Sequence, residues 1–110
     1  MITNADCTIY SRIRNGSADD TWLRQYVPEC WWFEDVKSSI TSNGLKTATV
    51  LTVRIPDTSI TVKVGDYIVK GNCSVEMQTV KDLSTEKYYA VTGANYNRFG
   101  MNPHVKVMGT

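Results

Sequence analysis

Turn-forming residues divide this chain into short segments in which apolar and polar residues alternate. Asn15-Gly16, Pro56-Asp57, Gly65-Asp66 and Gly71-Asn72 mark four of the divisions. Such dipeptides favour tight turns, because Gly and Asn tolerate a positive φ and Pro fixes its own φ. A period-two alternation between turns is the pattern of a β-strand with one buried face. We therefore predict a chain built from short strands.

The residue composition favours the same structure. The chain has 13 Thr and 12 Val beside four Leu and five Ala, and branched side chains suit a pleated sheet better than a helix. Its 110 residues are enough for one packed core. We predict an all-β fold with a single domain over residues 1–110. The expected architecture is a small β-barrel or sandwich of about seven to nine short strands, with a long loop and at most one short helical turn.

The alternation also predicts where the strands and the core lie. The predicted strands cover residues 8–14, 21–27, 30–36, 47–55, 59–64, 67–70, 88–92 and 104–108, with a further strand from 74 leading into a helical turn near 80–83. Pro28 is expected to end the second strand. Residues 37–46 are rich in Ser, Thr, Asn and Gly, and we predict that they form the long loop. The predicted core residues are Ile9, Leu23, Val50, Ile60, Val62, Ile68, Val69, Val91 and Val107.

Trp31, Trp32 and Phe33 form the densest aromatic cluster of the chain. In a strand, Trp31 and Phe33 point to one face and Trp32 points to the other. We predict that Trp31 and Phe33 pack in the core and that Trp32 is exposed as an interface anchor. All three are candidates for contacts with a neighbouring subunit or partner. The alternative is a platform on which single-stranded nucleic acid stacks, although the acidic residues beside the cluster would repel phosphates.

Residue types that carry catalysis are scarce in this sequence. His104 is the only histidine, and Cys7, Cys30 and Cys73 lie far apart without a CxxC pair. A structural zinc site needs about four such ligands in close pairs, and an odd number of cysteines does not suit a disulfide framework. The sequence also lacks a phosphate loop and a dinucleotide fingerprint. We predict no enzymatic activity, no metal and no cofactor, and three reduced, mostly buried thiols.

Charge and hydropathy limit the expected partners and location. There are 12 Lys and Arg against 11 Asp and Glu, a net charge of +1, whereas a dedicated nucleic-acid binder normally carries a clear basic excess. No segment approaches the roughly 20 consecutive apolar residues of a membrane helix. The first six residues have neither the basic nor the apolar region of a signal peptide. We expect an intracellular chain with no membrane partner.

Several segments, taken in order, resemble a known family. They are Met1-Ile2-Thr3-Asn4-Ala5-Asp6 before Thr8-Ile9-Tyr10, the aromatic cluster at 31–33, Val53-Arg54-Ile55-Pro56, Gly65-Asp66-Tyr67-Ile68-Val69-Lys70-Gly71, Asn97-Arg98-Phe99-Gly100 and Pro103-His104-Val105-Lys106-Val107. This order is similar to that of small proteins encoded in the morphogenesis clusters of tailed phages and Gram-positive prophages. Members of that family resemble minor virion proteins of the neck between head and tail.

The resemblance implies a structural role in the virion. A head-closure protein, or stopper, is a small β-barrel that assembles as a ring, here a hexamer or dodecamer, and seals the channel of packaged DNA. Its expected partners are the portal and adaptor proteins, the tail terminator or other tail proteins, and double-stranded DNA through non-specific contacts. Its expected location is the head–tail junction of the virion, after assembly in the host cytoplasm.

The residues expected to contact DNA in such a channel are Lys37, Lys46 and Arg98, because non-specific phosphate contacts need only a few basic side chains. Two other classes of function stay open. One is a different minor structural protein of the particle, such as a tail terminator or a capsid decoration protein. The other is a small barrel that binds single-stranded nucleic acid.

Overall fold

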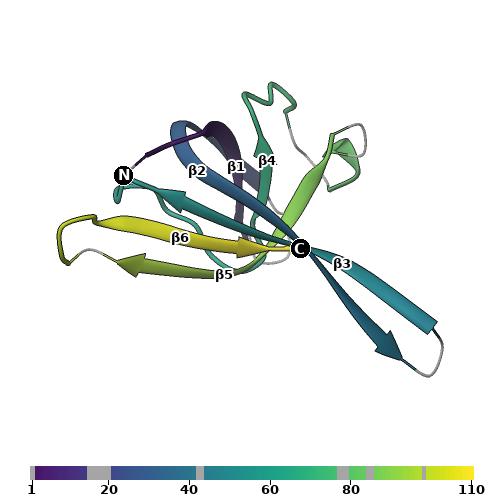
Figure 1. Ribbon diagram of the computed structural model, residues 1–110. Helices are drawn as coiled ribbons and strands as arrows, with labels where there is room; N and C mark the ends of the chain where they lie inside the picture. Colours follow the sequence, from purple (N-terminus) through teal and green to yellow (C-terminus); the bar gives the residue numbers. More distant parts are fainter. Residues whose placement is uncertain (1, 15–20, 42–43, 77–79, 84–85, 98) are drawn as a thin grey trace.

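The computed structural model describes residues 2–110 except 15–20, 42–43, 77–79, 84–85 and 98, and it forms a closed antiparallel β-barrel (Figure 1). Around the barrel the strands follow the order β1-β2-β3-β6-β5-β4. The elements are β1 (Ala5–Ile13), β2 (Thr21–Thr41), β3 (Gly44–Ile55), β4 (Tyr67–Lys70), the 3-10 turn η1 (Val80–Leu83), β5 (Tyr88–Asn97) and β6 (His104–Gly109). The all-β class and the barrel are confirmed, with six strands in the described residues.

Branched and aromatic side chains from all six strands fill the barrel. Because successive side chains of a strand point to opposite faces, every second residue enters the interior. Burying one such side chain contributes about 1.5–3 kcal/mol relative to leaving it exposed. The interior includes Ile9, Val27, Trp32, Leu51, Val53, Ile55, Val62, Ile68, Tyr89, Val91, Val105 and Val107.

Most of the predicted core residues are buried. Burial is confirmed for Ile9, Val62, Ile68, Val69, Val91 and Val107, and Ile60 is partly buried against the interior. Leu23 was predicted wrongly, since it is 53% exposed on β2. Val50 is only half-buried, because the inward residues of β3 are Leu51, Val53 and Ile55. Both errors come from apolar residues that stand on the outward face of a real strand.

The prediction that Pro28 ends a strand is wrong, because β2 continues through it. On β1, Ala5 pairs with Cys30 and Cys7 pairs with Val27. Two residues of β2, Pro28 and Glu29, therefore lie opposite the single residue Asp6. This is a β-bulge, in which the extra residue is left out of the hydrogen-bond ladder. Pro28, which has no backbone N–H, is therefore tolerated there. The two strands predicted on either side of Pro28 are thus one strand of 21 residues.

Residues 37–46, predicted to be a loop, instead belong to strands. Residues 37–41 lie in β2 and residues 44–46 lie in β3, in antiparallel register with one another. Only residues 42–43 connect them, and they lie outside the described part of the chain. Ser and Thr are common in loops, but Thr also has a high strand preference, and cross-strand pairing decides the outcome here. The expected long loop is an extended β-hairpin.

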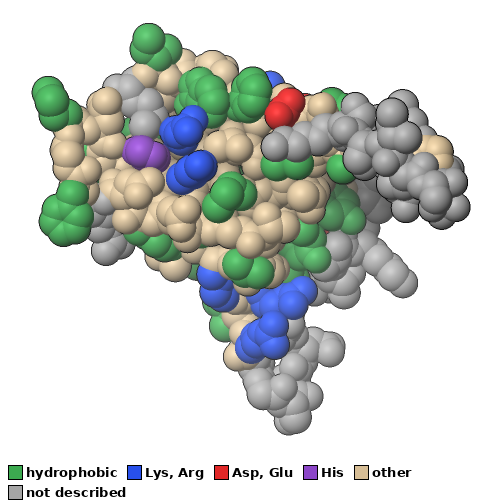
Figure 2. Space-filling model, turned by 60° about the horizontal axis from the view of Figure 1, so that its bottom comes forward, with side chains coloured by type: hydrophobic (Ala, Val, Ile, Leu, Met, Phe, Trp, Pro, Cys, Tyr) green, Lys and Arg blue, Asp and Glu red, His purple; other side chains and the backbone are tan. Residues whose placement is uncertain are grey.

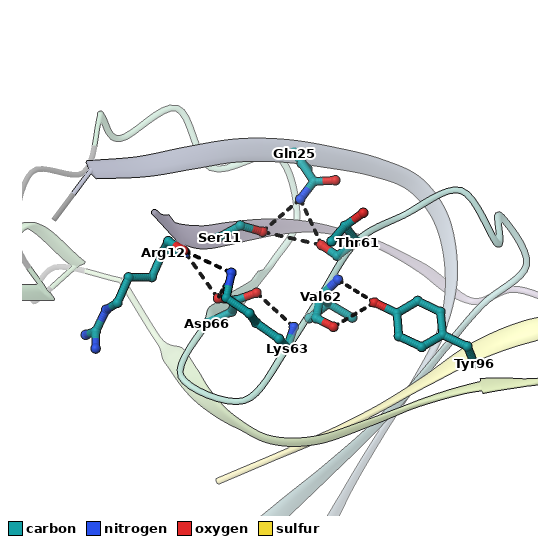
Figure 3. Close-up of polar contacts among 8 residues, drawn as sticks. All are labelled: Ser11, Arg12, Gln25, Thr61, Val62, Lys63, Asp66 and Tyr96. Atoms are coloured by element: carbon teal, nitrogen blue, oxygen red, sulfur yellow. Dashed lines mark hydrogen bonds and ion pairs between the residues drawn. The ribbon is translucent and has the colours of Figure 1, made fainter. Parts of the chain in front are cut away.

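The predicted strand at 59–64 is also wrong, although the segment still packs against the barrel interior through Val62. No strand is assigned between residues 56 and 66. Side chains hold this segment in place of a ladder (Figure 3). Tyr96 Oη donates to Val62 O at 2.7 Å and accepts from Val62 N at 2.9 Å, so one hydroxyl satisfies both backbone groups. Ser11 Oγ and Gln25 Nε2 donate to Thr61 O.

Asp66 anchors the end of this segment. Its side chain is fully buried, and its two carboxylate oxygens accept from Arg12 N at 3.1 Å and Lys63 N at 2.9 Å (Figure 3). Lys63 Nζ lies 3.8 Å from the same carboxylate. A buried charge is tolerated when it is paired and hydrogen-bonded. Asp66 therefore replaces the missing strand pairing between β1 and the 56–66 segment.

A second, smaller core lies outside the barrel wall. Tyr10, Val69, Cys73 and Leu83 are buried there, with Val75 packed against them. Tyr10 Oη donates to Val75 O at 2.7 Å. Residues 71–76 and η1 thus cover the outer face of β1 and β4. The strand predicted from residue 74 is absent over 74–76, and residues 77–79 lie outside the described part.

Candidate assembly surfaces

The aromatic cluster lies where β2 leaves its pairing with β1 and continues with β3. Trp32 points into the barrel and is 6% exposed, with its ring edge-on to Tyr89 at 6.0 Å between centroids. Trp31 and Phe33 point outward, and their rings stack at 5.5 Å with 13° between the planes. Phe33 is 48% exposed. The prediction that Trp32 is the exposed member is therefore wrong, because the register of β2 places Trp32 opposite the inward Val53.

Asn4 ends the pairing between β1 and β2 at the cluster. Its Oδ1 accepts from Trp32 N at 2.7 Å, and its Nδ2 donates to Trp32 O at 3.1 Å. The side-chain amide thus imitates one more residue of a neighbouring strand. Beyond this point, β2 pairs only with β3 among the described strands. Asn4 marks the boundary between the barrel and the projecting hairpin.

Glu34 fixes the inner side of the same boundary. Its Oε1 accepts from Trp32 Nε1 at 3.0 Å. Its Oε2 lies 3.4 Å from Nζ of Lys87, the residue that precedes β5. The hydrogen bond from Trp32 lowers the pKa of Glu34 below its ordinary value, and Lys87 adds to this effect. The base of the hairpin is therefore tied to the barrel by a charge-assisted hydrogen bond.

Replacing Glu34 with Gln should remove a pH-dependent part of the stability. A carboxyl whose pKa is lowered on folding stabilises the fold above its unfolded pKa, near 4.5, and loses this contribution as the pH falls through the folded pKa. Wild type should be more stable than Glu34→Gln at pH 7, and the difference should close as the pH falls below 4.5 and through the lowered pKa of Glu34. Thermal unfolding at several pH values measures this difference, and a gap that stays constant contradicts the assignment.

The projecting part of β2 and β3 forms a two-stranded arm, defined here as residues 35–50. It contains seven pairs, from Asp35–Val50 to Thr41–Gly44. At about 3.3 Å per residue the arm extends roughly 20 Å beyond the barrel, as Figure 1 shows at its lower right. β6 stops at Gly109 opposite Leu51, so no described strand flanks the arm. Two-stranded hairpins are marginally stable alone, so the arm is suited to docking on another surface.

The outward face of the sheet beside the aromatic cluster combines aromatic and basic side chains. The guanidinium carbon of Arg54 lies 4.7 Å from the centre of the Trp31 ring, and Arg54 pairs with Lys106 on β6. Figure 2 shows two basic side chains beside the single histidine, toward the left of the view, with hydrophobic side chains around them. Phe33 and Val36 are both exposed near the arm. Exposed aromatic and Arg side chains of this kind are enriched in protein interfaces.

Of the three residues predicted to contact DNA, two lie in the arm. Lys37 lies in the β2 strand of the arm, paired with Ala48, and Lys46 lies in the β3 strand, paired with Ser39. The backbone thus brings these two lysines into one hairpin. Arg98 lies outside the described residues.

The connection between β5 and β6 carries two apolar side chains that sequence reasoning did not single out. Phe99 is 97% exposed and Met101 is 99% exposed. Exposed apolar side chains that gather at one place can mark a contact surface. Their signal in the sequence is their position among Gly100, Asn102 and Pro103, which are turn residues. We call Phe99 and Met101 the apolar tip.

His104 makes two hydrogen bonds within the connection between β5 and β6. Its Nδ1 lies 2.8 Å from Asn102 O, which can only accept, so Nδ1 carries the proton. Its Nε2 then accepts from Asn97 Nδ2 at 3.3 Å. Both ring nitrogens of a neutral imidazole are thereby satisfied across the ends of β5 and β6. The lone histidine closes the β5–β6 turn.

The described residues hold no group of three His, Cys, Asp or Glu side chains that could bind a metal ion. Cys7, Cys30 and Cys73 are free and buried. The hydrogen bond from Cys7 to Cys30, together with burial, raises the pKa of the Cys7 thiol, and a protonated thiol is a poor nucleophile. Within the described part of the chain, no helix has the length and apolar character needed to cross a membrane.

Comparison with known proteins gives one match. Residues 2–110 match the family of unknown function DUF6751, which covers nearly the whole chain. No curated protein and no solved structure matches.

Proposed function

The chain belongs to the DUF6751 family, and we propose that it is a structural subunit of a ring in the head–tail connector of a phage virion. In this role it seals the channel of packaged DNA and docks the tail. The resemblance of the sequence to neck proteins supplies the context. The observation that carries the proposal is the arm, a hairpin that leaves a closed barrel and has no flanking strand among the described residues.

The arm and the apolar tip support a subunit with two separate contacts. Gly109 of β6 lies beside the base of the arm and His104 lies beside the apolar tip, so the two features stand at opposite ends of one sheet (Figure 1). A ring subunit needs one surface for its neighbours and another for the next layer of the assembly. We assign the arm to the neighbouring subunits and the apolar tip to the portal side or the tail side.

Contact with DNA is a minor part of this role. The arm carries Lys37 and Lys46, and the whole chain has a net charge of only +1. Weak, replaceable phosphate contacts are sufficient for DNA that must later leave the head. Neutralising Lys37, Lys46 and Arg98 together should therefore leave assembly intact and weaken DNA retention only at low salt.

The experiment that tests the proposal is deletion of the gene from the phage or prophage that encodes this chain. We expect filled heads that lose their DNA, together with unattached tails, in electron micrographs of the lysate. Supplying the gene in trans should restore complete particles. Complete infectious particles made without the gene would refute the neck assignment.

Replacing Phe99 and Met101 together with Ser should separate the two contacts. Neither side chain is buried in the chain, so the unfolding free energy should change by less than about 0.5 kcal/mol. Subunit assembly should persist, while heads and tails should fail to join in particles complemented with this variant. The matched control is Val64→Ser, an exposed apolar residue on the 56–66 segment. Normal particle yield with the Phe99/Met101 variant would show that the tip is not a docking surface.

A further inference from the structure

Both edges of the arm are open in the described structure. β1 to β6 pair in a complete circuit, although, among the described strands, β2 before Trp31 pairs only with β1 and β5 from Val91 onward pairs only with β6. Along the arm, β2 and β3 pair with each other and with no further described strand. Open edges recruit other strands because each presents a row of unpaired N–H and C=O groups. Another copy's arm presents two straight edges of the same length, so it is the matching partner.

The orientation of Trp32 identifies which amides face the open edge of β2. Both backbone groups of Trp32 bond to Asn4, on the side away from β3. Backbone orientation alternates along an antiparallel strand, and the β2–β3 register runs without a shift. The amides of Val36, Ser38 and Ile40 therefore point to the open edge of β2. Their pairing partners Thr49, Thr47 and Leu45 point to the opposite edge of the arm, on β3.

The two edges of the arm complement each other between copies. β2 and β3 run antiparallel within one arm. When two arms lie side by side and point the same way, the β3 edge of one copy and the β2 edge of the next are also antiparallel. Pairing of this kind uses both edges of every arm. A two-fold pairing of β2 with β2, or of β3 with β3, leaves one edge of each arm open.

We infer that neighbouring copies pair arm to arm, the β3 edge of one with the β2 edge of the next, to form a second, intersubunit β-barrel. The contact is head-to-tail, so it closes only when the copies form a ring. The inference rests on the ring of the proposed function and specifies the contact that forms it. A hexamer would contribute about twelve strands, and a dodecamer about 24, enough for an aqueous channel.

Two proline substitutions test this contact by blocking one edge each. Ser38→Pro removes an edge amide of β2, and Thr47→Pro removes the paired edge amide of β3, while the ladder within the arm keeps its own amides. Each variant alone should be monomeric in native mass spectrometry. An equimolar mixture should form a 1:1 dimer through the two edges that stay open, and nothing larger. Ser38→Thr, which keeps the amide, should assemble like wild type.

Each outcome decides the inference. Assembly of Ser38→Pro alone to the wild-type mass overturns it, as does a wild-type chain that stays monomeric at its highest soluble concentration. If Thr47→Pro alone dimerises, pairing is β2 to β2. A far-UV circular dichroism spectrum and melting temperature like those of Ser38→Thr show that the barrel is intact. Ile40→Pro, on the same β2 edge, serves as a second blocking variant.

The outcome is separable from that of the proposed function. Head-to-tail pairing in solution together with normal particles from a gene deletion refutes the neck role and leaves the arm contact standing. A neck defect after gene deletion, together with normal assembly of both proline variants, refutes the arm contact and leaves the neck role standing.

Discussion

Replacing Trp32 with Ala is expected to lower the free energy of unfolding by about 3–5 kcal/mol, the usual cost of removing a large buried aromatic side chain. Trp32 fills the barrel, packs edge-on against Tyr89 and donates its indole N–H to Glu34. The substitution leaves a cavity in the barrel and removes the indole N–H that donates to the Glu34 carboxylate. A domain of this size has only about 5–15 kcal/mol in total, so the variant should be close to unfolding.

The neighbouring Phe33→Ala is the matched control. Phe33 is half exposed and its main contact is the stacked Trp31, an interaction worth about 0.5–1.5 kcal/mol. Urea denaturation of both variants, at a concentration that keeps them monomeric, measures the two changes. An equal or larger loss for Phe33→Ala would mean that the face assignment of β2 is reversed.

Replacing residues 36–49 with Asn-Gly is expected to abolish assembly completely. The new turn joins Asp35 to Val50, a directly opposed pair of the ladder, and Asn-Gly favours a two-residue hairpin turn. The barrel keeps all its pairs, since β6 meets β3 only from Leu51 onward. Size-exclusion chromatography with light scattering should report a monomer for this variant and a ring for wild type.

The shortened variant should also keep the stability of the barrel. Measured at concentrations where both chains are monomeric, its unfolding free energy should match wild type within about 1 kcal/mol, because association otherwise raises apparent stability. Assembly of the shortened variant to the wild-type mass would place the ring contact outside the arm. A large loss of stability would instead show that the arm belongs to the barrel's own folding unit.

Local alternation and turn residues were sufficient to predict β4 and β6, each of which pairs with β5, the strand next to it in the sequence. The Gly65-Asp66 turn before β4 and the apolar alternation of β6 predict their elements well. The alternation in β4, β5 and β6 also predicts an inward Ile68, Val91 and Val107. Each of these signals is contained in a few residues, so tertiary pairing does not change it.

Features that depend on distant pairing could not be predicted in this way. Pro28 stays within β2 only because β2 bulges there, with Pro28 and Glu29 opposite Asp6 of β1. Residues 59–64 form no strand because Tyr96 and Asp66 take their backbone groups. The face of Trp32 follows from its register against Val53. The arm could not be predicted for the same reason. Residues 37–46 have only a weak strand pattern, and the pairing of β2 with β3 makes them strands.

The most direct measurement of the central claim is the location and copy number of this chain in purified virions. Cryo-electron microscopy of particles carrying a tagged chain, combined with quantitative mass spectrometry, gives both values. We predict a single ring of density at the head–tail junction, with the tag found nowhere else and a copy number equal to the ring order. Particles that lack the chain, or that carry it over the capsid surface or along the tail, would contradict the account.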